Sequence, residues 1–219
     1  SDDFETATAA QTLTATLSGA AAGTDVVYVS VDAGSSWTDR TSYVSGTALS
    51  GAITLTDDTT SAIHIKVTDA AGNDGTAVTQ AYTHDDTAPT ITYTGAIEIS
   101  ADTGTSDSDF NTKTAAQTLT ATLSGAIAAD DILQVSVNAG SSWANDDHDT
   151  DDGTALSTAI TLSGTSSIHV RIKDDAGNIG TATTQAYTLD TTAPTITFSG
   201  VDISDDTGTT ADDFNTNTA

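Results

Sequence analysis

The chain has 219 residues, of which 31 are Asp or Glu and only 5 are Lys or Arg, so its formal net charge is -26. Such a polyanion should attract cations, and it is not expected to bind nucleic acid or to insert into a membrane. Because cysteine is absent, a disulfide framework, a thiolate zinc site and a thiol nucleophile are excluded.

Hydrophobic residues make up 37% of the chain and aromatic residues 5%, a composition that can accompany disorder. The many Thr, Val and Ile residues in alternating runs instead favour thin β-sandwiches, which need divalent cations or salt to relieve carboxylate repulsion. The sequence has no signal-peptide pattern, and no stretch approaches the roughly 18 apolar residues of a membrane span. Since it begins and stops within a motif, we expect a fragment of a longer chain.

An internal repeat sets the domain organisation. The residues Phe4, Phe110 and Phe214 occupy matching motifs, which gives spacings of 106 and then 104 residues. This period is too long for a solenoid repeat and suits an immunoglobulin-like sandwich of about 100 residues. We therefore predict an all-β chain of tandem immunoglobulin-like β-sandwiches with about seven strands each. The predicted domains are repeat one without its first strand (1–89), repeat two (90–194), and the first strand and start of repeat three (195–219).

The expected strands of repeat two are short alternating runs. They comprise 117–124, the stretch containing Leu133, Val135 and Val137, then 155–162, and finally 180–188. Between the last two runs, Ile168, Val170 and Ile172 should point inward, with His169, Arg171 and Lys173 outward. Repeat one carries matching runs at 11–18, 27–31 and 48–55.

The repeats meet at a nearly identical string, 86–104 in the first copy and 190–208 in the second. Each copy contains an acidic residue, the only proline of its repeat, a short β-type run and a second acidic cluster. We interpret this string as the joint between modules, and its β-type run (195–203 in the second copy) as the opening strand of the following module.

Four motifs in this order resemble a known family. They are VSVDAGSSW (29–37), TDAAGN (68–73), DTTAP (190–194) and ISDDTG (203–208). Together they resemble the tandem bacterial immunoglobulin-like repeats of giant, type I-secreted, calcium-dependent adhesins of the RTX/BapA-like kind. The resemblance implies a secreted, cell-surface stalk of a biofilm or adhesion protein, in which Ca²⁺ at the junctions stiffens neighbouring repeats. The Gly-rich calcium nonapeptides that accompany this family are absent.

Calcium binding requires six to eight oxygen ligands that converge from carboxylates, carbonyls and water. We expect the turn at 174–178 to meet the joint that follows it, and the turn at 69–73 to meet its own following joint. The plain alternative is that Asp and Asn merely favour turns. The predicted ligands are Asp174, Asp175, Asn178, Asp190 and Asp206 at one junction, and Asp69, Asn73, Asp85, Asp86 and Asp102 at the other. Further candidates are Asp107, Asp109, Asp212 and Asp213.

Other motifs are interpreted as structural. The loop 147–153 resembles the start of an EF-hand but lacks its Gly and its bidentate Glu, so a variable solvated loop is favoured. The run from Ser30 to Trp37 fits an Asp-box hairpin turn, with Asn138 replacing Asp in the second copy, and both Trp37 and Trp143 should be buried. The four histidines show no zinc or catalytic-triad spacing, and we expect them at the surface.

The leading hypothesis is a non-enzymatic extender of a secreted adhesin, whose partners are the neighbouring repeats of the same chain. The alternative is a subunit of an extracellular filament: if the ends are natural, the spare strand at 195–203 could complete repeat one of an identical chain. A carbohydrate- or ice-binding module is a third possibility, but the repeats share no exposed aromatic platform.

Overall fold

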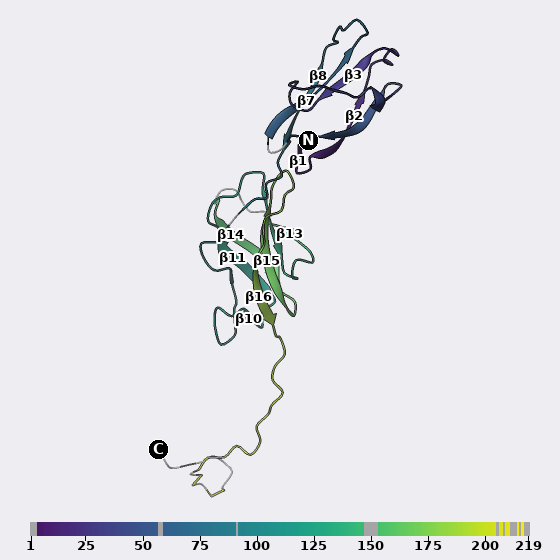
Figure 1. Ribbon diagram of the computed structural model, residues 1–219. Coiled ribbons are helices and arrows are strands. Elements are labelled where there is room, and N and C mark those ends of the chain that lie inside the picture. The colour runs from purple at the N-terminus through teal and green to yellow at the C-terminus, as the bar shows by residue number, and fades with distance from the viewer. Residues whose placement is uncertain are drawn as a thin grey trace. The chain divides into compact units, whose positions relative to one another are not determined.

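The structure is a computed structural model that describes residues 4–56, 59–90, 92–146 and 153–204, together with 206, 207, 209, 210, 214 and 216. Residues 1–189 form one compact unit, and residues 190–219 form a second, smaller unit. The larger unit holds two sandwiches with nearly the same plan, here called sandwich 1 (residues 4–84) and sandwich 2 (residues 92–189) (Figure 1).

Sandwich 1 consists of a five-stranded sheet and a three-stranded sheet. The larger sheet has the order β1-β8-β7-β3-β4, with β1 at Glu5–Thr6, β8 at Val78–His84, β7 at Thr59–Thr68, β3 at Val26–Ser30 and β4 at Thr38–Asp39. The smaller sheet has the order β2-β6-β5, with β2 at Ala10–Thr16, β6 at Ala48–Thr54 and β5 at Val44–Ser45. A single 3-10 turn, η1 at Thr41–Tyr43, precedes β5.

Sandwich 2 repeats this arrangement. Its larger sheet has the order β10-β16-β15-β12-β13, with β10 at Asn111–Thr112, β16 at Thr183–Leu189, β15 at Thr165–Lys173, β12 at Ile132–Ser136 and β13 at Ala144–Asn145. Its smaller sheet has the order β14-β11-β9, with β14 at Ala155–Thr161, β11 at Ala116–Thr122 and β9 at Glu98–Ile99. The predicted all-β fold of tandem immunoglobulin-like sandwiches is confirmed, and the predicted runs correspond to β11, β12, β14, β15 and β16.

Alternate side chains along each strand point into the core of the sandwich. On β15, Ile168, Val170 and Ile172 are buried, as predicted, because alternate side chains of a strand point to opposite faces. Leu133 and Val135 on the neighbouring β12 face the same core. A buried tyrosine near the end of the hairpin joins the two sheets in each sandwich. The Tyr187 hydroxyl donates to Val137 O, beside β12, at 2.8 Å and accepts Ser163 N–H, beside β14, at 3.2 Å. The Tyr82 hydroxyl likewise donates to Val31 O at 2.6 Å and accepts Thr56 N–H, beside β6, at 3.2 Å.

The two sandwiches differ at one edge. In sandwich 2, β11 is the central strand of its sheet because β9 pairs with it antiparallel, with Ile99 opposite Leu119. In sandwich 1 the equivalent strand β2 lies at the edge, and no strand among the described residues pairs with its free side.

The described residues of the unit at 190–219 form no strand. The run predicted as an opening strand (195–203) pairs with no strand of the described residues. The loop between Asp206 and Phe214 has the same hydrogen bond as the loop between Asp102 and Phe110 in sandwich 2. Phe214 N–H donates to Asp206 Oδ2 at 3.1 Å, and Phe110 N–H donates to Asp102 Oδ2 at 2.8 Å, and both phenylalanines adopt a positive φ.

None of the helical segments in the described part of the chain is both long enough and apolar enough to cross a membrane.

Candidate junction site

The two sandwiches are joined through the hairpin turn between β15 and β16. Asn178 Nδ2 donates to the backbone carbonyl of Asp85, the residue that follows β8, at 2.7 Å. On the neighbouring segment, Ala7 N–H donates to Ala176 O at 3.0 Å. These two hydrogen bonds link elements that are about 90 residues or more apart in sequence, so the turn of sandwich 2 is fixed to the end of sandwich 1 at two places.

The linker after Asp85 then packs against the same hairpin. A Cβ atom added to Gly180 would lie only 2.4 Å from Pro89 O, a distance that real Cβ atoms do not adopt. Only glycine allows this close approach of the linker carbonyl to the hairpin. Next to it, burial raises the pKa of Tyr93 to about 12. The joint therefore contacts the hairpin of sandwich 2 at Asp85 and again at Pro89.

The turn itself is held by Asp174, which is 9% exposed. Its Oδ1 accepts the N–H groups of Gly177 and Asn178, at 2.7 and 2.6 Å, and its Oδ2 accepts Asn178 Nδ2 at 2.9 Å. In sandwich 1, Asp69 and Asn73 form the same turn, with Asn73 Nδ2 donating to Asp69 Oδ2 at 2.9 Å. The acidic turns thus have a structural role, which orients Asn178 toward Asp85 in sandwich 2.

The predicted grouping of acidic residues into junctions is wrong in one respect. We expected the 174–178 turn to meet the joint that follows it, but it contacts Asp85 in the joint that precedes it. The reason is the hairpin: β16 runs for 7 residues away from the turn before it reaches Leu189 and then Asp190. An extended strand of that length spans about 23 Å, so the turn and the following joint lie at opposite ends of the sandwich. By the same reasoning the 69–73 turn and Asp85 lie at opposite ends of β8.

Asp102 belongs to the end of sandwich 2 that leads to Asp190. Thr112 pairs with Leu189 across β10 and β16, and Thr112 Oγ1 donates to the carbonyl of Ala101 at 2.6 Å. Asp102 Oδ1 is buried and has no hydrogen-bond partner among the described residues, and the same holds for Asp206 Oδ1 in the smaller unit. A buried carboxylate oxygen without a partner is costly, and a cation would supply one.

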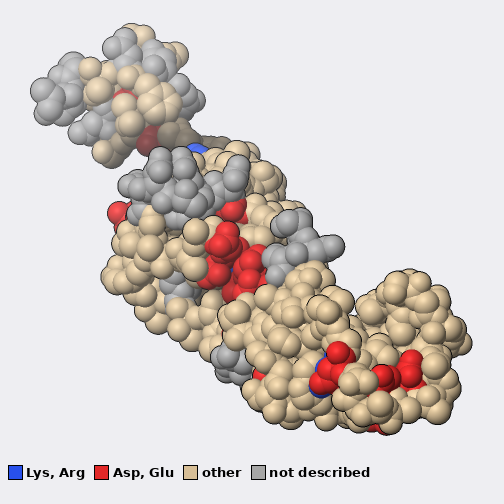
Figure 2. Space-filling model, turned by 90° about the horizontal axis from the view of Figure 1, so that it is seen from above, with Lys and Arg blue, Asp and Glu red and all other residues tan. Residues whose placement is uncertain are grey.

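Two acidic residues at the first junction were not predicted. Asp131 lies near the 174–178 turn, where burial raises the pKa of its carboxyl and the negative charge of Asp174 raises it further. Asp130 adds to this effect. Their position immediately before β12 could have suggested them, because that strand pairs with β15 and begins at the turn end of the sandwich. Figure 2 shows acidic side chains gathered in patches on the face in view, with very little basic surface.

The described part of the chain contains no group of three or more His, Cys, Asp or Glu side chains placed to hold a metal ion. Asp85 and Asp190 each accept the N–H of a residue two positions further on, Thr87 and Thr192, at 2.9 and 2.8 Å. Asp175 is exposed. Asp86 follows Asp85 in the linker, and Asp109 accepts Asn111 N–H at 3.0 Å. The candidates Asp212 and Asp213 and most of the 147–153 loop lie outside the described residues.

The Asp-box turns have the predicted structural role. Asp32 Oδ1 accepts Ser36 N–H at 2.9 Å and Ser30 Oγ at 2.7 Å, and Asn138 Oδ1 accepts Ser142 N–H at 2.9 Å in the second copy. The tryptophans, however, are only half-buried. A basic side chain lies over each ring instead, with the Arg171 guanidinium 3.7 Å from the Trp143 ring centre and Lys66 Nζ 4.5 Å from that of Trp37. These cations occupy a ring face that a sugar would need.

One histidine does not lie at the surface as expected. His84, the last residue of β8, is 1% exposed, and its Nδ1 lies 3.2 Å from Thr56 O. His64 and His169 pack edge-on against Trp37 and Trp143, with ring centres 6.2 Å apart in both pairs. All three positions are structural.

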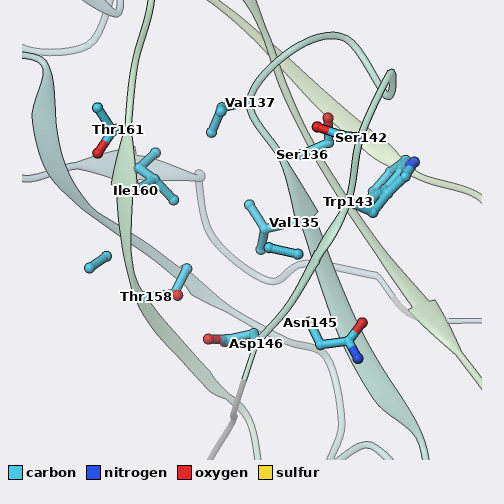
Figure 3. Close-up of a pocket in the computed structure, with 12 residues that line it drawn as sticks. Val135, Ser136, Val137, Ser142, Trp143, Asn145, Asp146, Thr158, Ile160 and Thr161 are labelled. Carbon is cyan, nitrogen blue, oxygen red and sulfur yellow. The ribbon is translucent and has the colours of Figure 1, made fainter.

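Figure 3 shows a cavity in sandwich 2, between β12 and β13 on one side and β14 on the other. Its volume is about 350 Å³, and Val135, Trp143 and Ile160 contribute to its lining. In sandwich 1 the ring of Tyr43 occupies the equivalent region, where it lies over Gly51. Asp146 lines the cavity and immediately precedes residues outside the described part of the chain, so the cavity defines no complete site.

The sequence matches no protein-family model and no curated protein. Among solved structures, the fibronectin(III)-like modules of CbhA from Clostridium thermocellum are similar to it, with 14% identity and a TM-score of 0.45 over 85% of this chain and 87% of that one.

Proposed function

We propose that this chain is a non-enzymatic extender: a run of immunoglobulin-like modules whose joints are held in a defined geometry, within a secreted or cell-surface adhesin. The observation that carries the proposal is the hydrogen bond from Asn178 Nδ2 to Asp85 O. An extender needs each module to restrain its neighbour, and this contact uses a turn that both sandwiches contain.

The repeated joint supports the same function. Gly75 occupies in sandwich 1 the position that Gly180 occupies beside Pro89, and Asp190 follows β16 as Asp85 follows β8. Every module therefore carries both halves of the contact, a receiving turn at one end and a joint at the other. Such a pattern can be continued from module to module without new residues. That the extender belongs to an adhesin is proposed from the four motifs that resemble the RTX/BapA-like repeats.

Calcium is the proposed ligand of the junctions. At the first junction the residues that would hold it are Asp85, Asp86, Asp174, Asp175 and Asn178, with Asp131 beside them. At the far end of sandwich 2 they are Asp102 and Asp109, and Asp190 in the smaller unit is a further proposed ligand. The observation that fits a cation is the buried Oδ1 of Asp102, which has no hydrogen-bond partner among the described residues. The mutual repulsion of Asp131 and Asp174 also favours a cation. Bound Ca²⁺ would supply positive charge that offsets this repulsion.

Asp69, Asn73 and Asp206 are equivalent by repeat to Asp174, Asn178 and Asp102. They are proposed to have the same roles at the junctions of sandwich 1 and of the module that begins in the smaller unit.

The test is small-angle scattering and thermal melting of the whole chain in calcium and in chelator, at fixed ionic strength. The proposal predicts a larger maximum dimension and a higher melting temperature in calcium. Asp102→Asn should weaken calcium binding in a titration, whereas Asp39→Asn, on β4, serves as the control and should leave it unchanged. Scattering and melting that are identical with and without calcium would reject calcium as the ligand.

A further inference from the structure

The chain enters and leaves sandwich 2 at opposite ends. The joint reaches the sandwich at Tyr93, which lies opposite Leu123, just beyond the end of β11. The chain leaves after Leu189 on β16, which pairs with Thr112 of β10. Thr112 Oγ1 lies 3.4 Å from the side-chain amide of Gln117, near the beginning of β11. Because the 7 residues of β11 span about 23 Å, tension on the chain is directed along the strands.

The entering segment is held along β11. Thr94 N–H donates to Thr122 O at 2.9 Å, and Ser124 N–H donates to Thr92 O at 2.7 Å. Further along the segment, β9 pairs antiparallel with the same strand. These hydrogen bonds run across the strands, so tension loads them together, in shear, rather than one after another.

The leaving strand is held in a similar way by β10, which belongs to the other sheet. β10 runs parallel to β16, with Asn111 opposite Thr188. Thr188 N–H also donates to the carbonyl of Phe110, a residue that is 5% exposed, at 2.9 Å. Tension pulls β10 toward the entry end and β16 toward the exit end, so these strands can separate only by sliding past each other. This pair is therefore a second contact loaded in shear.

Gln117 connects the two contacts, and it is only 4% exposed. Its Oε1 accepts Ala101 N–H at 2.8 Å and the Ser100 hydroxyl at 3.1 Å, just after β9. Its Nε2 donates to Thr114 O at 2.7 Å, just after β10. Between them, Thr112 Oγ1 donates to Ala101 O at 2.6 Å. One buried side chain of β11 thus holds the ends of both β9 and β10.

We propose that sandwich 2 bears tension along the chain, and that Gln117 makes its two sheared contacts yield in a single step. β9 cannot slide along β11 without breaking the hydrogen bonds of Gln117, which also fix β10. The use of this device rests on the proposed extender function, because an extender in an adhesin is stretched when the adhesin is pulled. The contacts lie within sandwich 2, so forced unfolding tests them separately from the junction.

Optical-tweezer measurements on the whole chain, in chelator, test the shear geometry. The chain has no cysteine, so handles can be attached at Ala88→Cys and Thr191→Cys, exposed positions before and after sandwich 2 in the sequence. A comparison chain carries Thr165→Cys with Thr191→Cys. Because Thr165 lies opposite Thr188, pulling there opens the ladder between β15 and β16 pair by pair. The unfolding force should be several times higher in the first geometry, and equal forces would overturn the proposal.

Gln117→Leu tests the connection between the contacts, since it keeps a buried side chain and removes its hydrogen bonds. Pulled in the first geometry, the unchanged chain should unfold in one step. The variant should show an earlier step at lower force that frees about 18 residues (93–110), roughly 60 Å of extended chain. The matched control is Gln11→Leu, at the equivalent position of sandwich 1, where Gln11 donates to Thr8 O at 2.6 Å. It should unfold like the unchanged chain.

Ser100→Ala is a milder second variant, because Ser100 is exposed and its hydroxyl donates one of the hydrogen bonds to Gln117. It should show the early step in a smaller share of the traces, and it decides the outcome if Gln117→Leu does not fold without load. The proposal is overturned if a folded Gln117→Leu chain unfolds in one step at the force of the unchanged chain. It is also overturned if Gln11→Leu shows the same early step.

Discussion

The side-chain amide of Asn178 donates a 2.7 Å hydrogen bond to the backbone carbonyl of Asp85. It connects a turn of sandwich 2 to the end of the last strand of sandwich 1, and the same amide is oriented by Asp174 Oδ2 at 2.9 Å. A side chain that is fixed on one module and bonded to the next restrains their relative movement.

Replacing Asn178 with Ala should loosen the junction. The loss of this hydrogen bond is expected to cost about 1 kcal/mol of junction stability, which corresponds to an increase of about fivefold in its opening. Because Ala7 N–H bonds to Ala176 O in the same turn, hydrogen exchange at Ala7 is the measurement. The control is Asn73→Ala, which removes the same contact within its own turn, to Asp69. Equal exchange at Ala7 in both variants would count against the role given to Asn178.

A methyl group at Gly180 should displace the linker. The added Cβ would lie 2.4 Å from Pro89 O, so Gly180→Ala requires the linker carbonyl to move. We expect a wider range of distances between the sandwiches, with each sandwich still folded. In Gly75→Ala the new atom would meet only Val67 O, at 3.2 Å and inside sandwich 1. In Gly75→Ala the distribution of distances between the sandwiches should therefore match that of the unchanged chain. If Gly75→Ala broadened this distribution as much as Gly180→Ala does, the broadening would not come from the contact with Pro89.

The Asp32 turn should give sandwich 1 an acid-sensitive contribution. The hydroxyls of Ser30 and Ser36 lower the pKa of the Asp32 carboxyl from 3.8 to about 2. Because the pKa is lower in the folded state, this contribution is fully present above pH 3.8 and is lost as the pH falls toward about 2. Asp32→Asn should be tolerated, since Asn138 forms the same turn in sandwich 2.

The measurement is the melting temperature of each variant between pH 2 and 5, a range of about three units around the ordinary Asp pKa. The gap between the unchanged chain and Asp32→Asn should narrow as the pH falls. The reciprocal change Asn138→Asp should introduce the same acid dependence into sandwich 2. Parallel curves for all three proteins would show that the carboxylate makes no pH-dependent contribution.

Tyr43 and Gly51 should be energetically coupled. A Cβ on Gly51 would fall 1.7 Å from a carbon of the Tyr43 ring, so Gly51→Ala should destabilise sandwich 1 by about 1–3 kcal/mol through overpacking. In a Tyr43→Ala background, Gly51→Ala should lower the free energy of unfolding much less. A double-mutant cycle from denaturant melts measures this coupling, and additive effects of the two changes would refute it.

The fold could be predicted largely from local patterns. The alternation around Ile168 and Val170 identified β15 and its buried face, and the spacing of Phe4 and Phe110 identified the repeat. The patterns did not show which end of a sandwich each acidic turn occupies. The turn at 174–178 and the joint at Asp190 are close in sequence, but β16 separates them by its full length.

The site was harder to predict for the same physical reason. Junction contacts join residues that are far apart in sequence, such as Asn178 and Asp85, and residue type alone does not say which end of a sandwich an acidic turn occupies. Burial was also misjudged at His84, because a polar residue at the end of a strand can be enclosed when its partner, here Thr56 O, lies across the sandwich. Its sequence neighbours give no sign of that partner.

The most direct test of the central claim, that the junction holds neighbouring modules in a defined geometry, is a distance distribution between the two sandwiches. The chain has no native cysteine, so spin labels can be attached to the Ser35→Cys and Ser141→Cys pair, at exposed and equivalent turn positions. The account predicts a single narrow distribution in calcium that broadens in chelator and broadens further with Asn178→Ala. A distribution that is broad in calcium and indifferent to Asn178→Ala would contradict it.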